Sequence, residues 1–406
     1  MPCRTTHVRA LSTVLTAVLA TGIVAAAPAL TDPPPAAAAP IYPAPDPDGF
    51  YAPTPDLAGH ANGDVLRSRT FGSAMFPGAT IWQLAYRSTN SSGAPIVGVT
   101  TVLLPIGGGA NRPLVSYQPY INSLGLQCAP SHTLFNGGLP EAPAINALLA
   151  RGWAVAVPDH LGPTSAYGAA RLGGQLVLDG IRAVKRFGPA DLGGSPVAMT
   201  GYSGGGMATG WAAALAPTYA PELPLVGAAM GGVPVNIGQL AVDLGGSPNP
   251  LFGLGFAAAL GLEREYPGQM DISDRLTPRG IDLRNRIANA CADTIISDGA
   301  NLSYPQVATS TPRSDAAANA VLNANSLQLY PGVPRIPIYE WHGSADQVPM
   351  ALAQNMAGRY CAAGVPVLFD VIPGADHGAA TAPGAMRAFG WIGDRFAGMP
   401  APSNCA

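Results

Sequence analysis

The sequence predicts an α/β protein with a mostly parallel central sheet, flanking helices and an inserted cap. Short apolar runs of strand length alternate with helical patterns from about residue 113 onward, as in strand–helix–strand units. Several of these runs are apolar without alternation, which is typical of parallel strands buried on both faces. A stretch rich in Gly, Pro and Asn at residues 233–325 interrupts the alternation before it resumes. We therefore expect residues 59–232 and 326–406 to form the core, with residues 233–325 as the cap.

The individual strands and helices follow from residue propensity and periodicity. Strand-like runs occupy residues 80–86, 96–104, 113–117, 153–157, 196–200, 336–341 and 365–372. The first two are expected to form an antiparallel pair that opens the sheet. Helical spacing of apolar residues marks residues 142–151, 171–187, 204–216 and 383–396, and an amphipathic stretch in the cap spans residues 282–296. Pro217 is expected to end the third helix.

The N-terminus has the features of a secretory signal peptide. Arg4 and Arg9 precede an apolar run that ends in small residues, so residues 1–29 are predicted to be removed. The Pro- and Ala-rich residues 30–58 are interpreted as an extended leader with no assigned fold. The best later apolar run, residues 251–262, is too short to cross a bilayer. We expect a secreted protein without a transmembrane anchor.

The cysteine count fits an oxidising compartment. The chain has 5 cysteines, and removal of the signal peptide takes away Cys3. An even set remains, and it allows three pairings: Cys128, Cys291, Cys361 and Cys405. Spacing alone leaves the choice among these pairings open.

Charge is scarce in this chain. Charged residues make up 11% of the 406 residues, against roughly 25% in a typical globular domain. The 21 Lys and Arg residues are outnumbered by 24 Asp and Glu residues, so no nucleic-acid partner is expected. The 48% of hydrophobic residues also excludes a disordered scaffold. We find no spacing of metal ligands and no phosphate-binding loop, so no metal and no cofactor are implied.

A candidate nucleophile lies directly after an expected strand and directly before an expected helix. The run Gly201-Tyr202-Ser203-Gly204-Gly205 matches the pattern G-x-S-x-G, which is weak by itself in a chain with 50 Gly. Its position between strand and helix is that of a nucleophile elbow. Gly201 and Gly205 would let the two elements approach closely, while the turn presents the Ser203 hydroxyl above the sheet. The alternative is a glycine-rich turn with a solvated serine.

The candidate base and acid lie in loops near the C-terminus. A serine nucleophile needs a hydrogen-bonded base that is oriented by a carboxylate, and both follow the serine in chain order in this class of fold. His377 follows a strand and satisfies this placement, whereas His342 lies at a strand end and is interpreted as structural. Asp346 is favoured as the acid over Asp376, which is adjacent to the base, and over Glu340, which lies within a strand.

The reaction that such a triad performs also needs an oxyanion hole. Two backbone N–H groups usually stabilise the negative charge of the tetrahedral intermediate. One is expected from Gly204, the residue after the nucleophile, and the other from the loop at residues 118–123.

Five motifs spread along the chain point to one family. They are Ser116-Tyr117-Gln118 followed by Cys128-Ala129-Pro130-Ser131, Val157-Pro158-Asp159-His160-Leu161-Gly162-Pro163, Gly201-Tyr202-Ser203-Gly204-Gly205, His342-Gly343-Ser344-Ala345-Asp346, and Asp376-His377-Gly378. From about residue 45 to the C-terminus the chain resembles the secretory lipase family, the lipase A-like branch of the α/β-hydrolases. The resemblance implies Ser203, Asp346 and His377 as the triad. It also implies the disulfides Cys128–Cys291 and Cys361–Cys405.

One position departs from the family's pattern. Members commonly carry an acidic residue in a Tyr-Glu-Asp-Ser-like run of the oxyanion loop, where this chain has Tyr120-Ile121-Asn122-Ser123. The backbone N–H of Asn122 is the expected second oxyanion donor, and the substitution leaves it in place. If the acidic side chain itself takes part, the Asn122 amide can still donate a hydrogen bond, but without any pH dependence.

The resemblance implies a secreted serine hydrolase that cleaves carboxylic esters, above all acylglycerols at a lipid–water interface, through an acyl-enzyme on Ser203. Candidates for the acyl pocket or lid are the apolar cap residues Leu251, Phe252, Leu254 and Phe256. The alternative is that these side chains only pack the cap onto the sheet. Competing hypotheses for the whole chain are a short-chain esterase, a peptidase or acyltransferase of the same fold, and a secreted binding protein whose site has decayed.

Overall fold

The computed structural model describes residues 39–405. The predicted signal peptide, residues 1–29, and the first part of the predicted leader lie outside the described residues. The rest of the leader has structure that is not expected from its sequence. It contains a short 3-10 helix, η1 (Gly49–Tyr51), whose Phe50 side chain is buried against β2 and β3. Asp48 beside it forms an ion pair with Arg69, so the end of the leader is part of the core.

Nine strands of the described residues form one sheet in the order β1-β2-β3-β5-β4-β6-β7-β8-β9. The strands are β1 (Val65–Phe71), β2 (Ala79–Thr89), β3 (Pro95–Pro105), β4 (Leu114–Gln118), β5 (Ala154–Pro158), β6 (Val197–Tyr202), β7 (Leu225–Gly231), β8 (Ile338–Gly343) and β9 (Val367–Ile372). The pairs β1–β2, β2–β3 and β3–β5 are antiparallel, and all the other pairs are parallel. The mostly parallel sheet and the opening antiparallel pair are confirmed.

Two strands, β1 and β7, are not predicted from the sequence. β1 is an edge strand in which arginines interrupt the apolar pattern. β7 has glycines at Gly227 and Gly231, where strands usually carry β-branched residues. A Cβ at Gly227 would lie 2.8 Å from the Trp391 ring, and one at Gly231 would lie 2.0 Å from the Trp341 ring. These glycines make room for two tryptophans that come much later in the chain.

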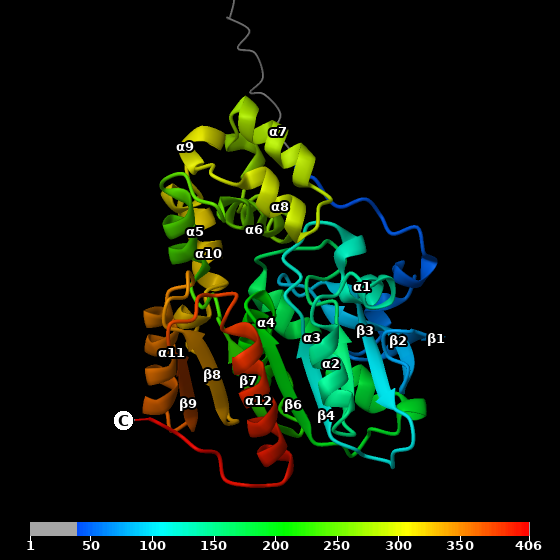
Figure 1. Ribbon diagram of the computed structural model, residues 1–406. Helices are drawn as coiled ribbons and strands as arrows, with labels where there is room; N and C mark the ends of the chain where they lie inside the picture. Colours follow the sequence, from blue (N-terminus) through cyan, green and yellow to red (C-terminus); the bar gives the residue numbers. More distant parts are fainter. Residues whose placement is uncertain (1–38, 406) are drawn as a thin grey trace, which may run out of the picture. The chain divides into compact units, whose positions relative to one another are not determined.

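Helices cover both faces of the sheet (Figure 1). They are α1 (Pro130–Asn136), α2 (Ala142–Leu149), α3 (Ala170–Arg186), α4 (Gly204–Tyr219), α5 (Ile237–Gly245), α6 (Phe252–Glu265), α7 (Pro278–Ile287), α8 (Ala292–Gly299), α9 (Tyr304–Val307), α10 (Ala316–Ala324), α11 (Met350–Ala362) and α12 (Thr381–Phe396). Buried side chains of α3, α4 and α11 pack on one face, and those of α1, α2 and α12 pack on the other. Within residues 39–405, no helix is both long and apolar enough to cross a membrane.

The segment between β7 and β8 is helical rather than loop-like. It contains α5 to α10, which gather at one end of the sheet (Figure 1). The amphipathic stretch at residues 282–296 belongs to two helices, α7 and α8, which are separated at Cys291. Before this segment, α4 continues past Pro217 to Tyr219. The missing N–H of Pro217 does not end the helix at that residue, so the expected helix end is wrong by a few residues.

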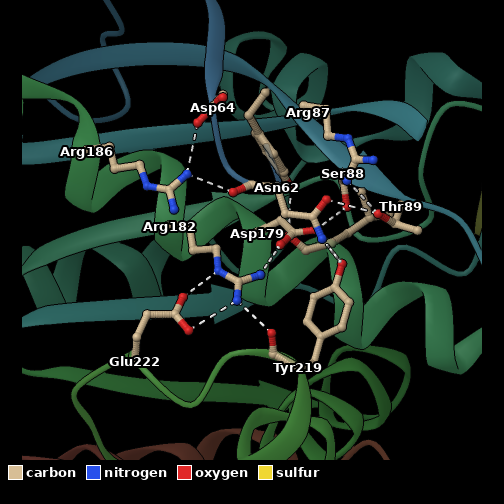
Figure 2. A network of polar contacts seen from close by, with 12 residues as sticks. Asn62, Asp64, Arg87, Ser88, Thr89, Asp179, Arg182, Arg186, Tyr219 and Glu222 are labelled. Carbon is tan, nitrogen blue, oxygen red and sulfur yellow. Dashed lines mark hydrogen bonds and ion pairs between the residues drawn. The ribbon is translucent and has the colours of Figure 1, made fainter. Parts of the chain in front are cut away.

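A buried carboxylate fastens α3 to the sheet and to α4 (Figure 2). Asp179 of α3 accepts hydrogen bonds from Ser88 of β2 and from Tyr219 at the end of α4, each at 2.7 Å. Arg182 forms ion pairs with Asp179 at 2.7 Å and with Glu222 at 2.6 Å. Burial raises the pKa of Asp179, and these donors oppose that rise. The network holds α4, the helix that begins directly after Ser203.

Candidate active site

The chain turns sharply between β6 and α4, and Ser203 lies at the turn. Its φ is 54°, in the left-handed region that residues other than glycine rarely adopt. A Cβ at Gly205 would lie 1.8 Å from the Gln118 carbonyl oxygen, and one at Gly201 would lie 2.6 Å from the Gly205 carbonyl group. Both flanking positions therefore require glycine, and the turn presents Ser203 at the carboxyl ends of the parallel strands.

The structure brings Ser203, Asp346 and His377 into hydrogen-bond contact. His377 Nε2 lies 2.9 Å from Ser203 Oγ, and His377 Nδ1 lies 2.8 Å from Asp346 Oδ1. Because a carboxylate only accepts, Nδ1 carries the ring proton and Nε2 is free to accept the serine proton. The Asp346 side chain is fully buried, whereas 25% of the His377 side chain is exposed. The Tyr202 hydroxyl also donates to the His377 carbonyl oxygen, which ties the base loop to the elbow.

Within the described residues, neither competing acid is hydrogen-bonded to the His377 ring, and the competing base is not hydrogen-bonded to Ser203. Asp376 Oδ1 accepts the Ala379 N–H at 2.8 Å and so stabilises the turn after the base. Glu340 is buried, its carboxyl group has no hydrogen-bond partner within the described residues, and burial raises its pKa well above the usual range. His342 is buried, and its Nε2 lies 3.6 Å from Asp346 Oδ2. Its position is that of a structural residue.

Gly204 and Asn122 lie against each other beside the nucleophile. Gly204 is the first residue of α4, so its N–H has no partner within the helix. A Cβ at Gly204 would lie 2.4 Å from Asn122 Oδ1. Asn122 has a φ of 45°, and among residues 39–405 its N–H donates to no other backbone group. Both residues line the cavity at Ser203, and within the described residues no backbone hydrogen bond is found for either N–H.

Two disulfides fasten the neighbourhood of the site and the C-terminal tail. Cys128–Cys291 joins the short helix η3 (Leu126–Cys128), which follows the oxyanion loop, to the start of α8. Cys361–Cys405 joins the end of α11 to the tail. These are the pairs that the family resemblance implies, and they select one of the three pairings that spacing leaves open.

An apolar cavity of about 100 Å³ opens at Ser203 and is lined largely by cap helices. Leu251 and Leu254 of the apolar cap run line it. Phe252 and Phe256 do not: both are buried inside the cap, with their rings stacked at 5.9 Å. As candidates for the acyl pocket the two phenylalanines are therefore wrong, because their side of α6 packs on the interior of the cap rather than on the cavity.

The other main wall of the cavity comes from α5, which sequence reasoning missed. Its lining residues are Ile237, Leu240, Ala241 and Leu244. Their spacing of i, i+3, i+4 and i+7 is that of one helix face. This periodicity was a usable signal for an amphipathic helix, although it does not tell which surface the helix covers.

Comparisons with known proteins identify the family of this chain. The family model for secretory lipases matches residues 140–404. A secreted triacylglycerol lipase of Malassezia restricta is 32% identical over 363 residues, which cover 81% of this chain and 74% of that protein. A Mycobacterium tuberculosis protein, named as a probable inactive lipase, is 33% identical over 386 residues, which cover 89% of this chain and 84% of that protein. The X-ray structure of Candida antarctica lipase A in its closed state matches with a TM-score of 0.82 and 30% sequence identity. The match covers 89% of this chain and 90% of that chain.

The fold and the site define an α/β-hydrolase, and the match with lipase A extends over most of both chains. The chain belongs to the secretory lipase family, because the family model spans more than half of it and relatives above 30% identity span most of it. It is a secreted carboxylic-ester hydrolase.

Proposed function

We propose that the chain hydrolyses acylglycerols through an acyl-enzyme on Ser203. The observation that carries this proposal is the line of hydrogen bonds from Asp346 through His377 to Ser203, at 2.8 and 2.9 Å, on an elbow at the mouth of an apolar cavity. A hydroxyl is a weak nucleophile until a neighbouring base takes its proton, and this geometry supplies such a base.

In the first half-reaction, Ser203 Oγ attacks the ester carbonyl carbon while its proton passes to His377 Nε2. Asp346 stabilises the imidazolium that forms, and the N–H groups of Gly204 and Asn122 stabilise the oxyanion of the tetrahedral intermediate. The intermediate collapses when the carbon–oxygen bond to the alcohol breaks and His377 returns the proton to the leaving alcohol. The acyl group remains on Ser203 as an ester.

In the second half-reaction, water replaces the alcohol. His377 Nε2 takes a proton from the water as its oxygen attacks the acyl-enzyme, and the same two N–H groups stabilise the second oxyanion. Collapse transfers the proton to Ser203 Oγ and releases the fatty acid. No atom changes its oxidation state in either half-reaction, and His377 carries one proton in each: from Ser203 to the leaving alcohol, and then from water back to Ser203.

The cavity supports an acyl chain as the group that binds beside Ser203. Its cap side is formed by aliphatic residues, among them Leu244 of α5, Leu254 of α6 and Leu251, the N-cap of α6. The name of the Malassezia relative, a triacylglycerol lipase, supports acylglycerols over simple esters.

A substrate series on the purified mature protein tests this function. We expect turnover of p-nitrophenyl esters from acetyl to palmitoyl and release of fatty acid from an emulsified triacylglycerol, with Ser203→Ala prepared in parallel as the blank. Turnover of acetyl esters alone would make the chain a short-chain esterase. Absence of turnover with every ester would refute the proposed function and indicate an inactive protein, as the name of the Mycobacterium tuberculosis relative states for that protein.

A further inference from the structure

The oxyanion loop contains a residue in an uncommon backbone conformation, Asn122. Asn122 has a φ of 45°, in the left-handed region, where a residue other than glycine persists only if its surroundings hold it. The loop runs from the end of β4 at Gln118 to Leu124, whose N–H donates to the Ala290 carbonyl oxygen of the cap at 3.0 Å. Between these points, support has to come from side chains.

Two buried side chains hold one peptide group of this loop from both ends. The Pro119 carbonyl oxygen lies 2.7 Å from His160 Nε2, and the Tyr120 N–H donates to Glu141 Oε2 at 3.1 Å. This carbonyl and this N–H belong to the same planar peptide unit. His160 is 2% exposed and Glu141 is 6% exposed. The peptide plane cannot rotate without breaking two buried hydrogen bonds, and it lies two residues before Asn122.

The protonation states of the two side chains suit these contacts. Burial lowers the pKa of His160 to about 4, so the ring is neutral at neutral pH. Since a carbonyl oxygen only accepts, Nε2 must carry the ring proton. Burial raises the pKa of Glu141 to about 8, so its carboxyl group is mostly uncharged and keeps a carbonyl oxygen for the Tyr120 N–H. Its other oxygen shares a hydrogen bond of 3.1 Å with the Tyr117 hydroxyl.

The same contacts give a role to a motif that the triad leaves unused. His160 follows Asp159 directly after β5. Asp159 accepts hydrogen bonds from the Ser131 N–H at 2.9 Å and from the Ser131 hydroxyl at 2.6 Å, at the start of α1. The pair Asp159-His160 therefore holds the chain after the oxyanion loop as well as the loop itself.

We propose that His160 and Glu141 are positioning residues of the oxyanion hole: they fix the peptide group between Pro119 and Tyr120 and thereby place the Asn122 N–H. The inference rests on the proposed function, because it assigns a supporting role within that same site. Neither side chain is expected to touch the substrate, so their contribution should fall on the transition state rather than on ester binding.

The test compares Glu141→Leu with Glu141→Gln on a soluble p-nitrophenyl ester. The leucine variant loses the acceptor for Tyr120, and we expect kcat to fall about 10- to 100-fold with KM changed less than about 3-fold. A trifluoromethyl ketone, which forms a tetrahedral adduct with the active serine, should bind more weakly by the same factor. The glutamine variant retains a carbonyl acceptor and an N–H donor, and it should stay within about 3-fold of the wild type.

Glu263→Leu is the matched control. Glu263 is equally buried and also accepts two hydrogen bonds, but both come from Ser273 of the cap, from its N–H and its hydroxyl, and neither comes from the oxyanion loop. Its variant should lose thermal stability while kcat stays within about 3-fold. Equal loss of kcat in Glu141→Leu and Glu263→Leu, or a rise of KM alone in Glu141→Leu, would overturn the proposal.

His160→Phe provides the second arm if Glu141→Leu does not fold. It removes the donor to Pro119, and it should lower kcat and ketone binding together at an unchanged KM. Unchanged kcat in folded His160→Phe would equally overturn the proposal. Wild-type turnover separates this outcome from failure of the proposed function: an inactive wild type refutes the function, whereas an active wild type with unaffected variants refutes only the positioning role.

Discussion

The catalytic loops and the cap of this protein are held in place by different means. Ser203, Asp346 and His377 each follow the end of a strand in one sheet, β6, β8 and β9, so sheet register brings them together. The cap helices instead depend on close contacts between distant segments. In one of them, a Cβ at Gly253 of α6 would lie 2.0 Å from the Ile295 carbonyl oxygen of α8. We therefore expect substitutions in the loops to change the rate of chemistry. Substitutions in the cap should instead change substrate choice or stability.

The largest effect is expected at the nucleophile. Ser203→Ala should lower kcat for a p-nitrophenyl ester by a factor on the order of 10⁵, because the acyl-enzyme can no longer form. Far-UV circular dichroism should be unchanged. Retained turnover in Ser203→Ala would contradict the assignment of Ser203 as the nucleophile.

The second effect separates two neighbouring carboxylates. Asp346→Asn should lower kcat on the order of 10³- to 10⁴-fold, because the amide no longer stabilises the protonated base or its correct tautomer. Asp376→Asn should stay within about 5-fold, because the Asp376 side chain accepts the Ala379 N–H in the turn and an amide oxygen can do the same. Steady-state kinetics on both variants decides between them, and equal losses would contradict the assignment of the acid.

The third effect concerns the cap. Leu254→Trp should fill the cavity and lower kcat/KM for a palmitoyl ester about 10-fold or more relative to an acetyl ester, because Leu254 lines the cavity. Phe256→Leu is the control within the same helix. It should lower the free energy of unfolding by about 1–2 kcal/mol without changing the ratio between the two esters, since Phe256 is buried inside the cap. A changed ratio in Phe256→Leu would contradict this division of α6.

The smallest effect on activity is expected at the tail disulfide. Replacing Cys361 and Cys405 by serine should cost about 2–4 kcal/mol of the free energy of unfolding and leave kcat within about 2-fold, because the bridge joins α11 to the tail. Replacing Cys128 and Cys291 should cost similar stability but lower kcat more, since that bridge lies next to the oxyanion loop. Denaturant unfolding and esterase assays measure both. Equal kcat values in the two variants would show that the second bridge has no influence on the site.

The difference between the loops and the cap also explains which parts of the fold and of the site the sequence predicts. The parallel sheet and the contact of Ser203 with His377 follow from local signals: apolar strand runs, a glycine-flanked serine and loops that follow strands. What was missed depends on contacts between distant segments. The glycines of β7 accommodate tryptophans from later strands and helices, and Phe252 and Phe256 face the interior of the cap although their neighbours face the cavity. Glu141 has no local signal at all, because its partner Tyr120 lies on another segment.

Covalent labelling by a fluorophosphonate tests the central claim most directly. We expect wild-type protein to take up one equivalent, which peptide mapping places on Ser203, and to lose esterase activity in proportion. Ser203→Ala should remain unlabelled. No uptake by the folded wild type, or uptake at another serine while esterase activity persists, would contradict it.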